Sequence, residues 1–286
     1  MKKTSLRKAT SAKLAKLQKI LKSMNRVLIA FSGGVDSTLL VKTAADVLGK
    51  NVLAVIASSE TYPAQEIRQA KKIAERLGVL HKTIHTHEIK NPDFVKNPPL
   101  RCYHCKQELF SRLKSLAAKA GIPYVLDGQN ADDVGDFRPG SKAGQELGVR
   151  SPLKEAGLTK AEIRRISRSF GLPTWNKPSL ACLASRFPYY TKITIDDLKK
   201  VGKAENLLED MGFGQLRVRH HGQIARIEIP LQDFPKILKP RLRRQIVDAF
   251  KKIGYPYVAL DLAGYRSGSL NEPLNPQQLR FRSNSG

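Results

Sequence analysis

The chain has 286 residues, of which 41% are hydrophobic and 26% are charged, as is ordinary for a folded protein of about two domains. No apolar run approaches the roughly 18 residues that cross a membrane, and no apolar segment follows the basic start of the chain. We therefore expect no membrane contact, no secretory signal and a cytoplasmic location. Three cysteines are too few for a disulfide scaffold, which excludes the small disulfide-rich class.

The net charge of +25 is extreme for this length. The first 35 residues contain no acidic side chain, and a second basic run covers residues 236–252. Such charge attracts polyanions, including nucleic acid, nucleotides and acidic substrates. A solvated surface suited to a salty or hot cell interior explains the same charge, so composition alone does not choose between these interpretations.

The first half of the chain predicts helices that alternate with short apolar strands. Helices are expected over residues 11–25, 36–48, 66–77 and 106–120, and strands over 26–31, 51–57, 81–87 and 124–126, with a loop rich in Pro and Asn at 91–99. This alternation is typical of a doubly wound α/β fold, in which helices cover both faces of a parallel sheet. We therefore expect an α/β domain over residues 25–176, preceded by a basic helix over 1–24.

After residue 175 the pattern changes to that of a smaller α+β unit. A loop is expected at 179–186, helices at 195–211 and 233–253, paired strands at 216–218 and 224–229, and a last strand at 257–262. We assign residues 177–275 to this C-terminal domain, and we expect residues 276–286 to form a disordered tail.

Three small polar segments follow strands of the predicted sheet. They are Ser32-Gly33-Gly34, Ser58 and Asp127-Gly128. Ligands of doubly wound sheets bind at the carboxyl ends of the strands. All three segments are therefore expected to border one binding crevice.

The string Ser-Gly-Gly-Val-Asp-Ser, at residues 32–37, joins a predicted strand to a predicted helix. Its glycines, Gly33 and Gly34, let the backbone turn sharply and bring N–H groups against an anion. The helix that follows adds the positive end of its dipole. The side chains expected to take part are the hydroxyls of Ser32, Ser37 and Thr38 and, for Mg²⁺, the carboxylate of Asp36. A turn of this composition without a ligand is the alternative.

The same string also restricts the chemistry. A Walker A loop needs G-x-x-x-x-G-K-[ST], and the chain has no such string. Loops of the Ser-Gly-Gly type retain pyrophosphate, so that the α-phosphate is attacked and AMP moves to a substrate. We therefore predict an ATP-splitting, AMP-forming enzyme of the PP-loop class, with ATP bound by the domain over residues 25–176.

Acidic and amide side chains crowd the end of the last predicted strand of this domain. Asp127 is followed by Asn130, Asp132 and Asp133. Carboxylates here would coordinate Mg²⁺ or orient the activated group, whereas the alternative is an Asx-rich turn that caps the next helix. Further along, Arg150 is placed to neutralise a phosphate, with an exposed surface arginine as the alternative.

The three cysteines point to metal or redox chemistry. Cys102 and Cys105 form a C-x-x-C motif before a predicted helix, and Cys182 lies in a predicted loop. Three thiolates are one short of the set that usually holds an iron–sulfur cluster, and a [4Fe–4S] cluster with three ligands would leave one iron open to a sulfide. A zinc site that also uses His104 is a rival. Reduced core cysteines, or a single reactive Cys182, remain as further alternatives.

A pair of arginines, Arg217 and Arg219, lies on one predicted strand. Both side chains face the same way, because side chains repeat every two residues along a strand. Two guanidinium groups so placed fit a phosphate, and an exposed basic strand face is the alternative. Glu228 lies on the predicted partner strand.

Over residues 10–275 the chain resembles the LarE family of ATP-dependent sulfur transferases. The segments that carry the resemblance are Val27–Thr38, Asp127-Gly128, Arg138-Pro-Gly, Val149-Arg-Ser-Pro-Leu, Trp175-Asn-Lys, Ala184-Ser-Arg-Phe-Pro-Tyr, Arg217-Val-Arg219, Ile224–Glu228 and Leu260–Gly268. The phosphate loop alone would indicate only the PP-loop superfamily. The later segments are more specific to this family.

The resemblance implies a reaction within the biosynthesis of the nickel-pincer nucleotide cofactor. The enzyme would adenylate a carboxylate of a pyridinium-3,5-dicarboxylate mononucleotide and release pyrophosphate. Sulfur would then displace AMP and leave a thiocarboxylate. In one branch of the family a single cysteine, in the segment that matches 179–185, gives up its sulfur and becomes dehydroalanine. In the other branch three cysteines hold a [4Fe–4S] cluster whose extra sulfide is passed on, and the presence of Cys102, Cys105 and Cys182 matches this branch.

Further expectations follow from matching this sequence to the family. Arg217, Arg219 and Glu228 fall where the family has phosphate-binding and catalytic groups, and Cys102, Cys105, Cys182 and Asp127 complete the expected catalytic set. Tyr190 departs from the pattern, since the family commonly has glycine there. The expected partners are the mononucleotide substrate, other enzymes of the cofactor pathway and a second copy of the chain.

Three other functions compete with this one. A PP-loop tRNA thiolation enzyme would suit the charge, but the sequence has no appended RNA-binding module or zinc ribbon, so nucleic acid is not the favoured partner. PP-loop amidases have no use for three cysteines. A nucleotide-binding sensor without chemistry is the alternative from outside the enzymes.

Overall fold

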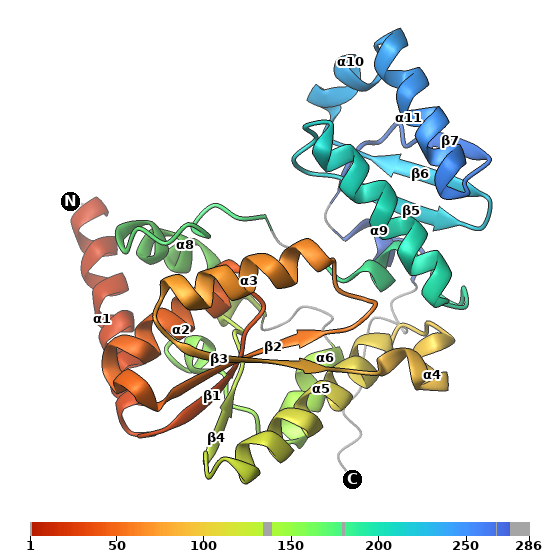
Figure 1. The fold of residues 1–286 in the computed structure, drawn as a ribbon. Coiled ribbons are helices and arrows are strands. Elements are labelled where there is room, and N and C mark those ends of the chain that lie inside the picture. Colours follow the sequence, from red (N-terminus) through yellow and green to blue (C-terminus); the bar gives the residue numbers. More distant parts are fainter. Residues whose placement is uncertain (1, 134–138, 179–180, 267, 275–286) are drawn as a thin grey trace. The chain divides into compact units, whose positions relative to one another are not determined.

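The computed structural model describes residues 2–133, 139–178, 181–266 and 268–274. The chain divides into two compact units by its internal contacts, and each is described by itself (Figure 1). The first unit contains Met1–Glu88 and Cys102–Leu180, and the second contains Ile89–Arg101 and Ala181–Gly286. Residues 89–101, assigned above to the first domain, thus group with the second. The predicted tail at 276–286, Arg138 and the start of the loop predicted at 179–186 lie outside the described residues.

A parallel sheet of four strands forms the centre of the first unit. The strands are β1 (Val27–Ala30), β2 (Val52–Ser58), β3 (Leu80–His85) and β4 (Tyr124–Leu126), in the order β3-β2-β1-β4. β1 pairs in parallel with both β2 and β4. The predicted parallel α/β sheet is therefore confirmed.

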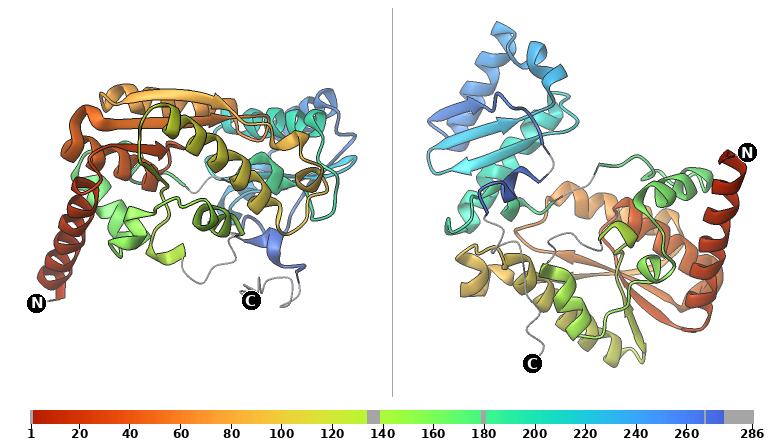
Figure 2. Two further views of the ribbon diagram at one scale, coloured as in Figure 1. Left: turned by 90° about the horizontal axis from the view of Figure 1, so that it is seen from below. Right: turned by 180° about the vertical axis from the view of Figure 1, so that it is seen from behind.

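Helices cover both faces of this sheet (Figure 2). One face carries α1 (Lys2–Lys22), α2 (Val35–Leu48), α3 (Ala64–Arg76), α7 (Pro152–Glu155) and α8 (Lys160–Ser169), and the other carries α5 (Arg101–Lys119), against which α6 (Pro139–Glu146) packs. The central strand shows the separation directly. Val27 and Ile29 are buried in the core on the first side, whereas Leu28 is buried with Leu113 on the second.

A three-stranded sheet forms the second unit. β5 (Arg217–His221) pairs antiparallel with β6 (Ile224–Glu228), as predicted, and β6 pairs in parallel with β7 (Tyr257–Leu260). The helices are α4 (Pro92–Val95), α9 (Ile195–Asp210), α10 (Phe234–Ile237) and α11 (Pro240–Ile253). α9 and α11 share one hydrophobic core with the inward face of the sheet.

Short 3-10 turns occur in both units, at Gly49–Asn51, Glu88–Lys90, Ala131–Asp133, Leu183–Arg186, Leu231–Asp233 and Ser269–Asn271.

Several predicted boundaries were wrong for identifiable reasons. The helix expected from 106 begins at Arg101, two residues after Pro99, so that the C-x-x-C motif lies inside its first turns. The helix expected over 233–253 is interrupted, because Pro240 lacks an N–H and starts a new helix. α8 was missed, although Thr159 and Glu162 form a complete capping box at its start. None of the described helices has both the length and the apolar character needed to cross a bilayer.

Candidate active site

The loop between β1 and α2 is shaped by two glycines. Gly33 has φ of +68°, which is unfavourable for other residues, and a Cβ added to it would lie 3.0 Å from both Cα and Cβ of Ala70 on α3. Gly34 is the N-cap of α2 and has no side chain to occupy the helix end. The first N–H groups of α2 are therefore left to a ligand.

Hydroxyl groups surround this helix end. The Ser32 and Ser37 hydroxyls lie 3.1 Å apart, and Ser37 also donates to the Gly34 carbonyl at 3.3 Å. Thr38 is fully buried, and its hydroxyl has no hydrogen-bond partner among the described residues. A buried polar atom without a partner costs free energy unless a ligand or water supplies one, so the loop fits an anionic group.

Asp36 is held by two side chains in the first unit. One carboxylate oxygen accepts from Asn130 Nδ2 at 3.3 Å, and the other forms an ion pair with Lys160 Nζ. Lys160, the first residue of α8, was not predicted as part of the site. Asp36 offers the oxygen donors that Mg²⁺ prefers, and Lys160 places a positive charge at the same carboxylate.

The end of β4 lies against the start of α2. A Cβ on Gly128 would lie 3.2 Å from Ser37 N, closer than most side chains come to a backbone atom, so a larger residue would push the two segments apart by a few tenths of an ångström. Asp127 is buried and accepts hydrogen bonds from Ser151 Oγ at 2.6 Å and from the Gln129 side chain at 2.7 Å. These hydrogen bonds hold the Asp127 carboxylate beside the Gly128 turn. Such an arrangement corresponds to the Asx-rich turn that was the alternative for this carboxylate.

The other two predicted residues of this unit have different surroundings. Ser58 is the last residue of β2, which pairs with β1, the strand that leads into the phosphate loop. Its carbonyl accepts from the Thr86 N–H at 3.0 Å. Arg150 pairs with Leu126 through its backbone, and its guanidinium forms an ion pair with Glu155 at 2.5 Å. The hydrogen bond to Glu155 raises the pKa of Arg150. The Arg150 charge is thus already neutralised.

Cys102 and Cys105 lie one helical turn apart near the start of α5. This spacing places them on one face of the helix, where Cys102 is exposed and Cys105 is half-buried. The helix α6 packs closely against this part of α5, because a Cβ on Gly140 of α6 would lie 3.3 Å from the Cys102 carbonyl. Nearby, Tyr103 donates to Glu146 at 2.6 Å, and this hydrogen bond raises the tyrosine pKa.

Cys182 belongs to the second unit, where it precedes the 3-10 turn at Leu183–Arg186. We call residues 181–186 the Cys182 turn. Three arginines donate to its backbone carbonyls: Arg186 to Ala181 at 3.0 Å and to Cys182 at 3.2 Å, Arg101 to Ala184 at 3.1 Å, and Arg219 to Ser185 at 2.7 Å. The backbone of the turn is therefore fixed by charged hydrogen bonds from its own Arg186 and from two other segments of the second unit.

Two of these arginines form buried, two-pronged ion pairs. Arg186 contacts both oxygens of Glu205 at 2.9 Å, and the two side chains are only 1% and 7% exposed. Arg219 contacts both oxygens of Glu228 at 2.9 Å, with exposures of 8% and 1%. Pairs at this depth are costly to break, because the remaining charge stays buried.

Arg217 has the same orientation as Arg219 but a different environment. Val218 between them lies in the core with α9 and α11, so the two arginines share the opposite face of β5, as predicted. Arg217 donates to its neighbouring carbonyl at Leu216, and its guanidinium lies 5.3 Å from the Tyr265 ring. Burial, and then the charge of Arg186, lower the pKa of Arg217. An anion bound here would stabilise the charged guanidinium.

His220 lies next to this face but points into the core. Its Nδ1 is 3.0 Å from the hydroxyl of the buried Tyr255, and its Nε2 is 3.8 Å from Asp197. Burial lowers the pKa of His220. The negative charge of Asp197 raises this pKa in part, but the net shift remains downward. The neutral imidazole is the form that this part of the core accepts.

The second unit should therefore lose stability between neutral and mildly acidic pH. His220 takes up its proton at a lower pH in the folded chain than in the unfolded chain, because its folded-state pKa is lowered, so the free energy of unfolding falls as the pH drops below about 6.5. Denaturant unfolding followed from pH 7.5 to 5 should show this slope. His220→Gln, which keeps polar contacts but does not titrate, should reduce it; an equal slope in the variant would contradict the assignment.

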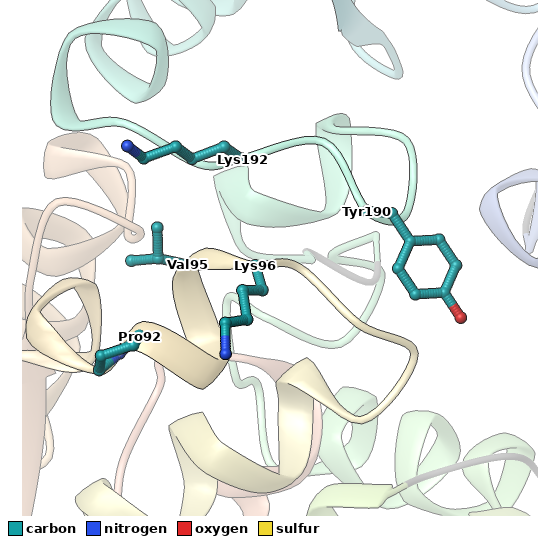
Figure 3. Close-up of a pocket in the computed structure, with 5 residues that line it drawn as sticks. All are labelled: Pro92, Val95, Lys96, Tyr190 and Lys192. Atoms are coloured by element: carbon teal, nitrogen blue, oxygen red, sulfur yellow. The ribbon is translucent and has the colours of Figure 1, made fainter.

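Tyr190 lies at the rim of a surface depression of about 550 Å³ in the second unit, lined by Pro92, Val95, Lys96, Tyr190 and Lys192 (Figure 3). Its φ is +65°, a left-handed conformation, and its side chain is 65% exposed. Its N–H donates to the Asn97 carbonyl at 2.9 Å. The backbone thus has the conformation that suits glycine at the position where the resemblance expects one.

Replacing Tyr190 by glycine should stabilise the protein. The left-handed conformation costs an ordinary residue roughly 1–2 kcal/mol, and glycine removes most of that cost. We expect Tyr190→Gly to raise the thermal midpoint by a few degrees and Tyr190→Ala, which keeps the strain, to leave or lower it. Equal midpoints for the two variants would show that the conformation carries no strain.

The predicted site residues thus fall into two groups. The first unit brings together Ser32, Gly33, Gly34, Asp36, Ser37, Thr38, Asp127 and Gly128, and the second brings together Cys182, Arg217, Arg219 and Glu228. Cys102 and Cys105 belong to the first unit. Across the described part of the chain, no three His, Cys, Asp or Glu side chains gather in an arrangement that would hold a metal ion.

Sequence reasoning missed four residues of these surroundings: Lys160, Arg101, Arg186 and Glu205. Arg186 lies in a segment that carried the family resemblance, so it could have been predicted as a site residue from that segment. Glu205 had no such signal, because it occurs inside an otherwise ordinary amphipathic helix.

Comparison with known proteins adds independent evidence. A family model described as NAD synthase matches residues 10–98. An uncharacterized protein of Synechocystis sp. is 44% identical over 263 residues, which are 92% of this chain and 98% of that protein. The pyridinium-3,5-bisthiocarboxylic acid mononucleotide synthase of Lactiplantibacillus plantarum is 41% identical over 273 residues, 94% of this chain and 97% of the relative. A tRNA-specific 2-thiouridylase of Sphingopyxis alaskensis is 28% identical over 193 residues, 54% of this chain and 50% of the relative.

The first two relatives match nearly end to end, whereas the thiouridylase matches only about half of the chain. The NAD synthase model covers the phosphate loop and the first three strands. The chain therefore belongs to the LarE family of ATP-dependent sulfur transferases, within the PP-loop superfamily.

Proposed function

We propose that the chain uses ATP to convert a carboxylate of a pyridinium-3,5-dicarboxylate mononucleotide into a thiocarboxylate, for the nickel-pincer nucleotide cofactor. The observation that carries this proposal is the near end-to-end match, at 41% identity, to a synthase named for the bisthiocarboxylic acid product. The glycine loop with its buried, unpartnered Thr38 hydroxyl supports the ATP-dependent half of the reaction.

The first step would be adenylation. A substrate carboxylate oxygen attacks the α-phosphorus of ATP, the bond to the β-phosphate breaks, and pyrophosphate leaves with the electron pair. The N–H groups at the start of α2 and the hydroxyls of Ser37 and Thr38 would hold the leaving pyrophosphate. Asp36 would hold Mg²⁺, which neutralises phosphate charge when bound.

Substrate phosphate would be bound in the second unit. Arg217 would contact it, because this arginine shares a face of β5 with Arg219, and Glu228 already neutralises Arg219. Arg219 would instead position the Cys182 turn through the Ser185 carbonyl. Sulfur then attacks the acyl carbon, AMP leaves, and a thiocarboxylate remains.

We further propose that Cys102, Cys105 and Cys182 hold a [4Fe–4S] cluster, which would supply sulfide when bound. Support comes from the number of thiols and from the one-turn spacing of the first two on α5. Protein purified without oxygen should contain about four irons and matching acid-labile sulfide per chain. An iron-free, active protein, or the loss of one H₂S from Cys182 after a single turnover, would instead favour the sacrificial route.

One experiment tests the whole proposal. Anaerobic incubation with ATP, Mg²⁺ and the dicarboxylate mononucleotide, read by mass spectrometry, reports adenylate, thiocarboxylate and the state of Cys182 together. Release of pyrophosphate only when the mononucleotide is present separates the enzyme from a nucleotide sensor. Release of orthophosphate in place of pyrophosphate would overturn the proposed chemistry. Thiolation of tRNA under the same conditions would favour the function in the name of the thiouridylase relative.

A further inference from the structure

Lys177 ends the segment Trp175-Asn-Lys, which the proposed reaction has not used. Its ammonium lies 3.3 Å from the Gly33 carbonyl, 2.6 Å from Glu66 Oε2 and 3.1 Å from Gln69 Oε1, and its side chain is 14% exposed. These three acceptors match the three N–H bonds of an ammonium. Glu66 neutralises its charge, so the lysine serves as a fixed donor to the loop and not as a cation directed at a ligand.

The helix α3 supplies the other side of this contact. Glu66, Gln69 and Ala70 lie three and four residues apart, and so share one face of the helix. Ala70 is the residue against which Gly33 packs without room for a Cβ. Lys177 therefore joins the Gly33 carbonyl to the same helix face that Gly33 already touches.

The geometry of the peptide bond gives this contact a consequence for the ligand. The Gly33 carbonyl and the Gly34 N–H belong to one planar trans peptide and point in opposite directions. With the oxygen directed at Lys177, the N–H is directed into the loop, where it donates to Ser32 Oγ over a long 3.4 Å. A peptide between two glycines has little intrinsic preference for either orientation.

We propose that Lys177 is a positioning residue that fixes the Gly33–Gly34 peptide with its N–H toward the pyrophosphate of ATP. Without the lysine the peptide can rotate, and the carbonyl oxygen would then face the anion. This role deepens the ATP-dependent function proposed above and depends on it. It requires no contact between Lys177 and the nucleotide.

The test compares Lys177→Met with a matched control. Lys42→Met removes another lysine–carboxylate pair of the first unit, at 2.5 Å from Asp46 on the exposed side of α2. Binding of inorganic pyrophosphate and of ATP, each with Mg²⁺, is measured by calorimetry, and the Gly34 amide signal is followed by NMR in protein labelled with ¹⁵N-glycine. We expect Lys177→Met to weaken both ligands at least tenfold, on the order of one hydrogen bond to a charged group, and to shift the Gly34 signal before any ligand is added. The control should do neither.

Unchanged affinities, or an unmoved Gly34 signal, in a folded Lys177→Met protein would overturn the inference. If the wild-type protein itself bound neither ligand, the proposed use of ATP would fail instead, so the two failures are distinguishable. Should Lys177→Met not fold, Glu66→Ala tests the same contact from its other end, because it removes the nearest acceptor of Lys177. A smaller loss of affinity, about threefold or more, is then expected for one weakened hydrogen bond, and no loss would overturn the inference.

Discussion

Gly33→Ala should lower the rate of pyrophosphate release by at least about a hundredfold, which corresponds to roughly 2.7 kcal/mol of transition-state stabilisation. The added Cβ would lie 3.0 Å from the Cα and Cβ of Ala70, and a methyl at φ +68° is itself strained. Because the clash includes a backbone atom of α3, a side-chain rotation cannot relieve it. The loop must move, and the N–H groups that face the pyrophosphate move with it.

Gly78→Ala is the matched control for this prediction. Gly78 has a similar φ of +65°, but no atom lies within 4 Å of the position that its Cβ would take. Both variants should lose about 1 kcal/mol of stability from the strained backbone, and only Gly33→Ala should lose activity. The measurement is pyrophosphate release under saturating substrate, together with the unfolding midpoint. Comparable activity in the two variants would show that the close approach of α3 does not shape the loop.

The phosphate loop was predictable because local sequence determines it. Two glycines between an apolar strand and an amphipathic helix permit few other structures, and the loop's residues are consecutive in the chain. The parallel sheet was predictable for a similar reason, since each strand is a short apolar run separated from the next by a helix.

The supports of the site were not predictable, since they are contacts between distant residues. Lys177 reaches Gly33 across 144 positions, and Lys160 reaches Asp36 across 124. The local sequence of Lys160 does not differ from that of the many surface lysines of so basic a chain, whereas Lys177 lies in the Trp175-Asn-Lys segment that carries the family resemblance. Residues 89–101 are likewise a short stretch whose grouping with the second unit depends on contacts such as Arg101 with Ala184.

Two of the arginines do not contribute to a basic surface. Arg186 and Arg219 each form an ion pair with a buried glutamate and donate to the backbone of the Cys182 turn. Each of these pairs cancels in the net charge, so the excess of 25 positive charges lies on other side chains. The buried pairs therefore leave the attraction of the protein for polyanions unchanged.

Glu205→Leu should be the most destabilising single change in the second unit, by about 3–5 kcal/mol. It would leave the Arg186 guanidinium, 1% exposed, without its carboxylate, and it would remove the acceptor of the Val218 N–H at 2.9 Å. Glu205→Gln keeps an acceptor and should cost less. Denaturant unfolding monitored on the second unit measures both. A loss below about 1 kcal/mol for Glu205→Leu would mean that water reaches Arg186 and that the pair is not truly buried.

The double variant Arg186→Met/Glu205→Leu separates stability from function. Replacing both partners of a buried pair by apolar residues is often close to neutral, so the part of the loss that comes from the unpaired Arg186 charge should return, although the Val218 N–H still lacks its acceptor. Activity should not return with it, because Arg186 also donates to the carbonyls of Ala181 and Cys182, and methionine has no donor. A stable double variant that still transferred sulfur at the wild-type rate would show that the Cys182 turn needs no arginine to hold it. A stable but inactive one would show that this buried charge is kept for the position of the cysteine and not for the fold.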